Sequence, residues 1–255
     1  MPTFVHGKGT KVYLDEFDLT TYFQSADVTT SNEANEVTAF SDTYKTYLLG
    51  LADGTLSMNG LWSKDTDGSD EELHAILGSA TTPLITVAEA AGTIGNKSTI
   101  AKAHETNYSI SNPVADVSTI TADFQGSTDA VANLTYGIAG ATQLTTGSSI
   151  AFGALGNLSG VDSPLGVAST AGGVGVLHVP TNTIAGGVTT IKIQHDSAAD
   201  FSSAADLITF STVAASTATS EMVAVSGTVN RYVRATATTV GSSGAITFMV
   251  SFARF

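Results

Sequence analysis

Three side chains of the kind that build a hydrolytic triad stand side by side in this 255-residue chain, at His195, Asp196 and Ser197. Such a triad requires the serine to donate a hydrogen bond to the histidine while the acid orients that histidine from its other side. Consecutive residues rarely converge in this way, and the G-x-S-x-G turn of α/β-hydrolases does not occur in the sequence. The run is therefore predicted to be a turn at a strand end. No catalytic residue is assigned, and the protein is not expected to be an enzyme.

No run of residues has the spacing of a metal-binding or phosphate-binding motif either. The acidic run that starts at Ser63 is similar to a calcium loop, but its first and twelfth positions are Ser63 and His74, where carboxylates are needed. The glycine-rich run at 92–98 lacks the Gly-Lys pair of a phosphate loop. The histidines show no zinc-ligand spacing; they are His6, His74, His104, His178 and His195. We therefore predict no metal site and no cofactor.

Alternating apolar residues indicate that strands make up most of the chain. Leu56, Met58, Gly60 and Trp62 share one face at the period of two that a half-buried strand requires. The composition is rich in Gly, Ser, Thr, Ala and Val, which suits strands and turns. Near the start of the chain, one strand is predicted before the acidic turn at 15–18 and another after it, from Leu19 to Phe23. Further strands are predicted at Leu84–Val87, Lys97–Ile110, Val114–Phe124, Gly187–Gln194, Leu207–Phe210, Met222–Ala237 and Ala245–Phe252.

One helix is predicted at Ser69–Leu77. Ser69 and Glu72 have the spacing of a capping box, the acids at 70–72 complement the positive helix end, and Gly78 is a stop signal. Two turns are too few to be stable alone, so this helix must pack on a sheet. The predicted fold class is all-β, a sandwich or half-barrel with one short flanking α-helix at about 69–77.

Charge is scarce and unevenly distributed. The net charge is −13, and residues 1–72 hold thirteen acidic groups against four lysines. Nucleic-acid binding of the usual kind needs clustered Lys and Arg and is not expected. Between Ala130 and Ile191 only Asp162 is charged. This segment is either a flexible insertion or a set of strands that neighbouring subunits cover, where charge would be costly to desolvate.

The cellular setting follows from what the chain lacks. It has no cysteine, which excludes disulfides and thiolate metal sites and fits synthesis in a reducing cytoplasm. The first ten residues, MPTFVHGKGT, lack the apolar region of a secretory signal, and no stretch reads as a membrane span. No membrane partner is expected.

Blocks at both ends of the chain carry a family resemblance. The blocks are GKGTKVYLDEFDLTTYF at 7–23, TAFSDTYKTYLLGLADGTLSMNGLWS at 38–63, IKIQHDSAADFSSAADLITFSTV at 191–213 and GTVNRYVRATATTVGSSGAITFMVSFARF at 227–255. In this order they resemble the major tail (tail tube) proteins of long-tailed bacteriophages. The resemblance does not cover Ala130–Ile191. It implies a single tail-tube domain over 1–255.

That resemblance implies a structural role in the virion, with synthesis in the host bacterial cytoplasm. Subunits of the family form hexameric rings whose inner sheets join into a closed β-barrel, and the rings stack into a tube that delivers DNA. The implied partners are other copies of the chain, the tape-measure protein, the tail terminator and the distal tail or baseplate proteins. Double-stranded DNA passes through without specific binding. The alternatives are a phage head decoration or fibre protein and a secreted bacterial surface β-protein.

Residues are assigned to this role in two groups. The ring-to-ring loop of the family maps onto Ser41–Asp53, and the candidate subunit contacts are Tyr44, Lys45, Tyr47, Leu48, Leu49, Arg231, Arg234 and Arg254. An acidic lumen wall would repel a DNA duplex and let it slide. The candidate lumen acids are Asp15, Glu16, Asp18, Asp27, Glu33 and Glu36. The acidity has an alternative explanation, which is that it keeps the protein soluble.

Overall fold

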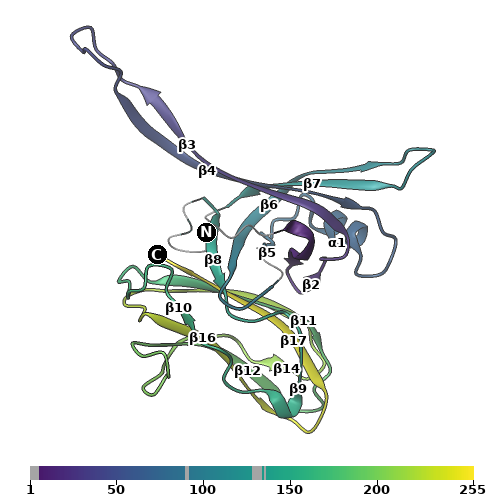
Figure 1. The fold of residues 1–255 in the computed structure, drawn as a ribbon. Helices are drawn as coiled ribbons and strands as arrows, with labels where there is room; N and C mark the ends of the chain where they lie inside the picture. The colour runs from purple at the N-terminus through teal and green to yellow at the C-terminus, as the bar shows by residue number, and fades with distance from the viewer. Residues whose placement is uncertain (1–5, 90–91, 128–133, 135) are drawn as a thin grey trace.

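Two β-hairpins project from a body of packed sheets in the computed structural model of this chain (Figure 1). The structure describes residues 6–89, 92–127, 134 and 136–255. Within those residues it holds one α-helix, and all of the strand pairs are antiparallel. The predicted all-β fold with one short helix is confirmed.

The first half of the chain carries both hairpins and the helix. β3 and β4 form the longer hairpin, β6 and β7 form the shorter one, and β4 also pairs with β7. Strands β3, β4, β7 and the outer part of β6 thus make one four-stranded sheet. The elements are η1 (Gly7–Gly9), β1 (Lys11–Leu14), β2 (Phe17–Asp18), β3 (Phe23–Glu36), β4 (Tyr47–Leu61), α1 (Ser69–Ile76), β5 (Leu84–Ala88), β6 (Lys97–Ser111) and β7 (Thr119–Gly126).

The second half is a β-sandwich. Strands β15, β11 and β17, with β9 at the end of β17, face a second sheet in the order β10-β16-β12-β13. Side chains of both sheets share one hydrophobic cluster, which includes Leu177, Ile193, Val233 and Phe248. The elements are β8 (Ile138–Gln143), β9 (Ser149–Ala151), η2 (Phe152–Ala154), β10 (Val161–Asp162), β11 (Gly173–Asn182), β12 (Val188–Asp196), β13 (Ala205–Thr209), β14 (Val213–Ala214), β15 (Thr219–Val225), β16 (Tyr232–Val240) and β17 (Ala245–Arg254).

The predicted alternation on β4 is confirmed. Leu56 and Met58 are buried in the core under the four-stranded sheet, whereas Thr55 and Ser57, which alternate with them, lie on its other face. Phe124 on β7 is opposite Leu56 and fills the same core. Burying one such side chain contributes roughly 1.5–3 kcal/mol. One face of this sheet is therefore fixed inward.

Helix α1 covers that core, but its N-terminus differs from the predicted capping box. The N-cap is Gly68, and Ser69 is the first helical residue. The Ser69 hydroxyl instead donates to the carbonyl oxygen of Leu61 at 2.9 Å, which ties the helix start to the end of β4. Leu73 is fully buried against the sheet, as the prediction of a packed helix requires. The helix ends at Ile76, close to the predicted Leu77.

Several predicted strand boundaries were wrong. Residues 19–22 form a turn before β3, so the strand predicted there begins only at Phe23. The strand predicted from Val114 begins at Thr119, because 112–118 is the loop of the shorter hairpin. The strand predicted over 222–237 is two strands, β15 and β16.

One part of the segment from Ala130 to Ile191, strand β11, excludes charge for a reason within the subunit. Strand β11 lies between β15 and β17, with Val174, Val176 and Val179 fully buried. A central strand covered on both faces excludes charge, because an unpaired buried charge is costly. Residues 128–133 and 135 of the segment lie outside the described residues.

A buried histidine joins the two halves. His178 on β11 is fully buried; its Nε2 lies 2.7 Å from the Thr86 hydroxyl, and its Nδ1 lies 2.6 Å from the Asp15 carbonyl oxygen. Its ring stacks on Tyr13 with centroids 5.5 Å apart. Burial lowers the His178 pKa to about 4. The neutral imidazole is therefore the form that fits between β1, β5 and β11.

Glu105 is the last inward-facing residue before a bulge in β6. It continues the alternation of the buried Ala101 and Ala103 and lies opposite the buried Phe124, and the register shift that follows it turns Asn107 to the outward face. Glu105 is 5% exposed, and neither carboxylate oxygen has a hydrogen-bond partner among the described residues. Desolvation raises its pKa to about 8. An unsatisfied buried polar group of this kind destabilises a fold.

We predict that Glu105→Met stabilises the subunit, and more so at high pH. Because the folded-state pKa lies above the ordinary value of 4.5, the stability that comes from the protonated carboxyl is complete below that pH and is lost as the pH rises through 8. Methionine removes both orphaned oxygens, so we expect a gain of about 1–3 kcal/mol at pH 9 and a smaller gain at pH 5. Urea unfolding of dilute protein at both pH values measures this.

The matched control is Glu33→Met, because Glu33 is exposed on β3. A Glu33→Met gain as large as that of Glu105→Met, or an equal gain for Glu105→Met at both pH values, would contradict the assignment of Glu105 as a buried, titrating carboxyl.

Candidate assembly surfaces

The longer hairpin extends well past the body of the molecule (Figure 1). It is built from the 14 residues of β3 and the 15 residues of β4. The loop predicted at Ser41–Asp53 is shorter than expected: the connection covers 37–46, and 47–53 belongs to β4. We call residues 37–51 the hairpin tip.

Large apolar side chains gather on the hairpin tip without cover from their own chain. Phe40 is fully exposed, Tyr44 is 83% exposed and Leu49 is 73% exposed. Leu48 and Leu49 are neighbours in a strand and therefore point to opposite faces, so both faces of the tip are apolar. The exposed set is Val37, Phe40, Tyr44, Tyr47, Leu48, Leu49 and Leu51. Such a patch marks a surface that binds a partner.

Two candidates of opposite charge pair with each other at the tip. The Lys45 ammonium group lies 2.8 Å from a carboxylate oxygen of Glu36. Both side chains are largely exposed, so this pair contributes little to stability. Its effect is local, because it holds the ends of β3 and β4 together across the loop.

The outward face of the four-stranded sheet is polar and carries carboxylates. Asp27 on β3, Ser57 on β4, Asp123 on β7 and Asn107 on β6 are successive partners across the sheet. The Ser57 hydroxyl donates to Asp123 at 2.6 Å, and the Asn107 amide donates to its other oxygen at 2.9 Å. These hydrogen bonds lower the Asp123 pKa. The face therefore keeps its negative charge.

Two acids on or beside this face were missed by sequence reasoning. Asp123 lies within a predicted strand, and its alternation with the buried Ala122 and Phe124 was the available signal. Asp53 lies on β4, where the Gln125 amide donates to its carboxylate. Asp53 had been placed in a loop because the strand was expected to start later.

The structure does not bring all candidate lumen acids together. Asp27 lies on the polar face, and Glu33 and Glu36 lie further along β3 toward the tip. Asp15, Glu16 and Asp18 lie instead in and beside the turn between β1 and β2, and the Asp15 carboxylate accepts from the Leu84 backbone at 2.8 Å. Burial raises the Asp15 pKa.

The three arginines bind partners within their own chain, in the sandwich. Arg231 forms a two-pronged pair with Asp162 at 2.8 and 2.7 Å, which lowers the Asp162 pKa. Arg234 donates to the Gln194 side chain and lies over the Phe201 ring, 4.4 Å from its centroid. Arg254 donates to the backbone oxygens of residues 229–231. Their role as subunit contacts stays a prediction.

The triad-like run serves as a turn. The Asp196 carboxylate accepts from the backbone N–H groups of Ala198 and Ser203 at 3.0 and 2.8 Å, which caps the loop that follows β12. The Ser197 hydroxyl lies 3.4 Å from the same carboxylate, and His195 Nδ1 accepts from the Asn230 backbone. These side chains do not have the serine-to-histidine hydrogen bond of a triad.

The described residues hold neither a cluster of metal ligands nor a helix that could span a membrane. No group of three or more His, Cys, Asp or Glu side chains in that part of the chain could hold a metal ion. No helix there is long and apolar enough to cross a membrane.

The four-stranded sheet has two open edges in the described part of the chain. β3 pairs only with β4 along its whole length. β6 pairs with β5 and β8 up to Lys102, and from Glu105 to Ser111 it pairs only with β7. An open strand edge presents unpaired N–H and C=O groups that can pair with another chain.

Comparisons with known proteins found similarity only among solved structures, since no family model and no curated protein matches the chain. A chain from the tail of an empty gene transfer agent particle is 14% identical, with a TM-score of 0.40, over 48% of this chain and 93% of that one. The SPP1 tail tube protein is 8% identical, with a TM-score of 0.40, over 48% and 74%. The SPP1 Dit protein, from the adsorption apparatus, is 12% identical, with a TM-score of 0.37, over 96% and 99%. These three structures come from the tail of a gene transfer agent particle and from the tail tube and adsorption apparatus of the phage SPP1.

Proposed function

We propose that this protein is a structural virion protein that self-assembles as stacked rings into a phage tail tube, the conduit for DNA delivery. The hairpin tip is the observation that carries the proposal. Seven large apolar side chains are exposed there, on both faces of a two-stranded ribbon. A ribbon with no core on either side gains its stability from partners, and burial of each such side chain is worth roughly 1.5–3 kcal/mol.

The open edges of the four-stranded sheet support ring formation. β3 and the outer part of β6 lie on opposite sides of that sheet, so the β6 edge of one copy can pair with the β3 edge of the next. A contact between two different surfaces closes into a ring when the rotation between copies divides a full turn. Closure joins the sheets into a barrel and leaves no open edge. The tail-tube resemblance implies six copies in each ring.

Stacking of rings follows from the direction of the longer hairpin. β3 and β4 run along the sheet and continue beyond it (Figure 1). In a closed ring the hairpin tip would therefore leave the barrel at one end. A tip with an apolar surface on both faces reaches the next ring. One ring then places its tips on another, which extends the assembly along its axis.

The polar face of the sheet fits the lumen side of such a barrel. Its other face is closed by the core and α1, so the face with Asp27, Ser57 and Asp123 is the one left for the interior. These rows carry hydroxyl, amide and carboxylate groups but no lysine or arginine, so they have no cation that would bind a phosphate. A duplex would slide past. The tape-measure protein, tail terminator and distal tail proteins remain partners implied by the tail-tube resemblance.

We predict that the purified protein forms rings or tubes at high concentration. Negative-stain microscopy and sedimentation over a concentration series measure this. Apolar association with a positive heat capacity of dissociation also weakens on cooling, so disassembly should increase at low temperature. A species that stays monomeric at all concentrations and is absent from tubes in intact virions would contradict the proposed function.

We predict that Tyr47→Asp with Leu48→Asp blocks tube formation and leaves the subunit folded. Both side chains are more than half exposed, so the change in unfolding free energy should be within about 0.5 kcal/mol. In an assembly each new carboxylate would be buried without a partner, which is strongly destabilising. Microscopy measures assembly, and circular dichroism with urea measures folding.

The matched control for that variant is Asn35→Asp with Thr46→Asp, which adds the same charge at exposed polar positions of the same hairpin. Normal tubes from the Tyr47/Leu48 variant would show that the tip is not the contact. Loss of folding would place these residues in the subunit core, and equal loss of assembly in the control would mean that charge alone is responsible.

We predict that the lumen is net negative, with Asp27, Asp53 and Asp123 on its wall. These acids lie in strands of the sheet whose core face is already closed. A cryo-electron microscopy structure of the assembled tube measures this directly. A lumen wall lined by Lys8, Lys11, Arg231 or Arg234 would overturn the repulsion argument.

A further inference from the structure

The shorter hairpin ends in an apolar loop that its own chain does not cover. We call residues 112–118, between β6 and β7, the second tip. Val114 is fully exposed and Val117 is 60% exposed. Asp116 accepts a hydrogen bond from the Val117 backbone, and no cation pairs with it among the described residues. The second tip therefore presents two apolar side chains and one carboxylate that is not paired with a cation among the described residues.

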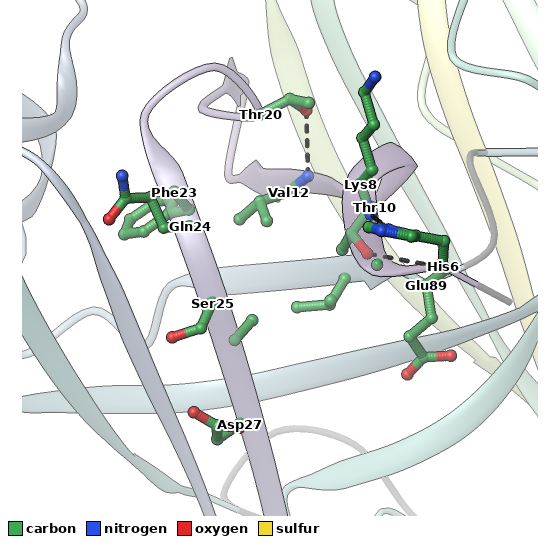
Figure 2. Close-up of a pocket in the computed structure, with 13 residues that line it drawn as sticks. His6, Lys8, Thr10, Val12, Thr20, Phe23, Gln24, Ser25, Asp27 and Glu89 are labelled. Carbon is green, nitrogen blue, oxygen red and sulfur yellow. Dashed lines mark hydrogen bonds between the residues drawn. The ribbon is translucent and has the colours of Figure 1, made fainter.

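A groove beside the start of β3 has the complementary character. Figure 2 shows this groove, with β3 as one wall and η1 with the residues around it as the other. We call it the base groove; its volume is about 690 Å³, and its apolar lining comes from Val12, Phe23, Ala26 and Val87. Lys8 and His6 stand on the η1 side. Lys8 is exposed and has no ion-pair partner in the described part of the chain.

Strand register places the second tip and the base groove at the same level of the sheet. Ser111 on β6 is opposite Thr119 on β7, which is opposite Leu61 on β4, and the adjacent Gly60 is opposite Phe23 on β3. At the other end of the open β6 edge, Glu105 shares a row with Phe124, Leu56 and Val28. The open part of β6 thus spans the same rows as the first residues of β3.

Because strands tilt against the axis of a closed barrel, the second tip meets the groove in the register that pairs the two edges row by row. When the β6 edge of one copy meets the β3 edge of the next, Ser111 arrives beside Phe23 of that neighbour. The second tip follows Ser111 directly, so it arrives at the neighbour's base groove. Both elements lie on the two edges that the proposed ring would join.

We propose that the second tip of one copy docks in the base groove of the next copy around the ring, with Val114 in the apolar part and Asp116 beside Lys8. This inference rests on the proposed ring assembly. The contact uses different surfaces on its two sides, so each copy donates one tip and receives one.

The acids of the base groove do not oppose this arrangement. Glu89 accepts a hydrogen bond from the Thr99 hydroxyl at 2.5 Å, which holds its carboxylate toward β6 of its own chain. Asp27 lies opposite Ser57, in the row that faces away from the core. The cationic part of the groove, at Lys8, is therefore the part that an incoming carboxylate would meet.

Cysteine pairs test this contact sharply, because the chain has no cysteine of its own. The pairs are Val114→Cys with Ala26→Cys, and Val117→Cys with Thr10→Cys. Each pair joins a second-tip position to a base-groove position. A disulfide forms only where the two Cα atoms come within about 7 Å. After assembly has been verified by microscopy, mild oxidation and a non-reducing gel should show a ladder of covalent oligomers.

The matched control is Val114→Cys with Thr217→Cys, since Thr217 is exposed in the sandwich, away from the groove. We expect this variant and each single-cysteine variant to give no ladder beyond a dimer. Assembled protein in which neither groove pair forms a ladder would overturn the docking and leave the ring proposal standing. A wild-type chain that never assembles would instead overturn the proposed function itself.

A charge exchange provides a second, independent measurement. Lys8→Asp and Asp116→Lys each place like charges together in the proposed contact, so each alone should raise the concentration needed for assembly about five-fold or more. The double variant restores an opposite-charge pair and should recover most of that loss. Both positions are exposed, so folding is not at risk. Single variants without effect, or a double variant that is as impaired as the two losses combined, would contradict the pairing.

Discussion

The rest of this structure depends on the fact that only one face of the β3-β4-β7-β6 sheet has a core behind it. Leu56, Met58 and Phe124 fix that face inward, and a one-residue slip would turn all of them outward. The opposite face is then committed to polar residues, and the hydrogen bonds around Asp123 arrange them across three strands. The strand register and the polarity of the free face thus both follow from the burial of one face of the sheet.

The core ends before the longer hairpin does, and this explains the character of the hairpin tip. Gly54 marks the boundary, because the Tyr136 carbonyl oxygen packs where a Cβ would lie, at 2.3 Å. Beyond that point no layer packs beneath β4, so neither face of the strand is buried and apolar residues have no preferred face. Apolar side chains then stand on both faces, as at Leu48 and Leu49. A two-stranded ribbon of this kind is only marginally stable by itself.

Sequence reasoning predicted what depends on short-range pattern and missed what depends on register. The alternation on β4 and the helix at 69–76 come from local spacing and were found. The bulge after Glu105 was out of reach: simple alternation places Glu105 and Asn107 on one face, and only the register shift between them leaves Glu105 inward with Ala103 and turns Asn107 outward. The candidate acids were chosen by charge and position in the chain, so Asp15 and Asp27 were grouped although they lie on different parts of the molecule.

In the proposed assembly, the charge of the protein leaves association to apolar contacts. A net charge of −13 makes two copies repel, but at physiological salt that repulsion extends only about 8 Å. When two apolar surfaces meet, they gain the free energy of burying their side chains. Repulsion opposes this contact only between charged groups that lie close to each other in the interface. The few cations then affect the register between two copies more than the affinity of one copy for another. Lys45 is already paired with Glu36, and Arg231 with Asp162, so an unpaired lysine at an open edge selects which carboxylate of a neighbour can approach it.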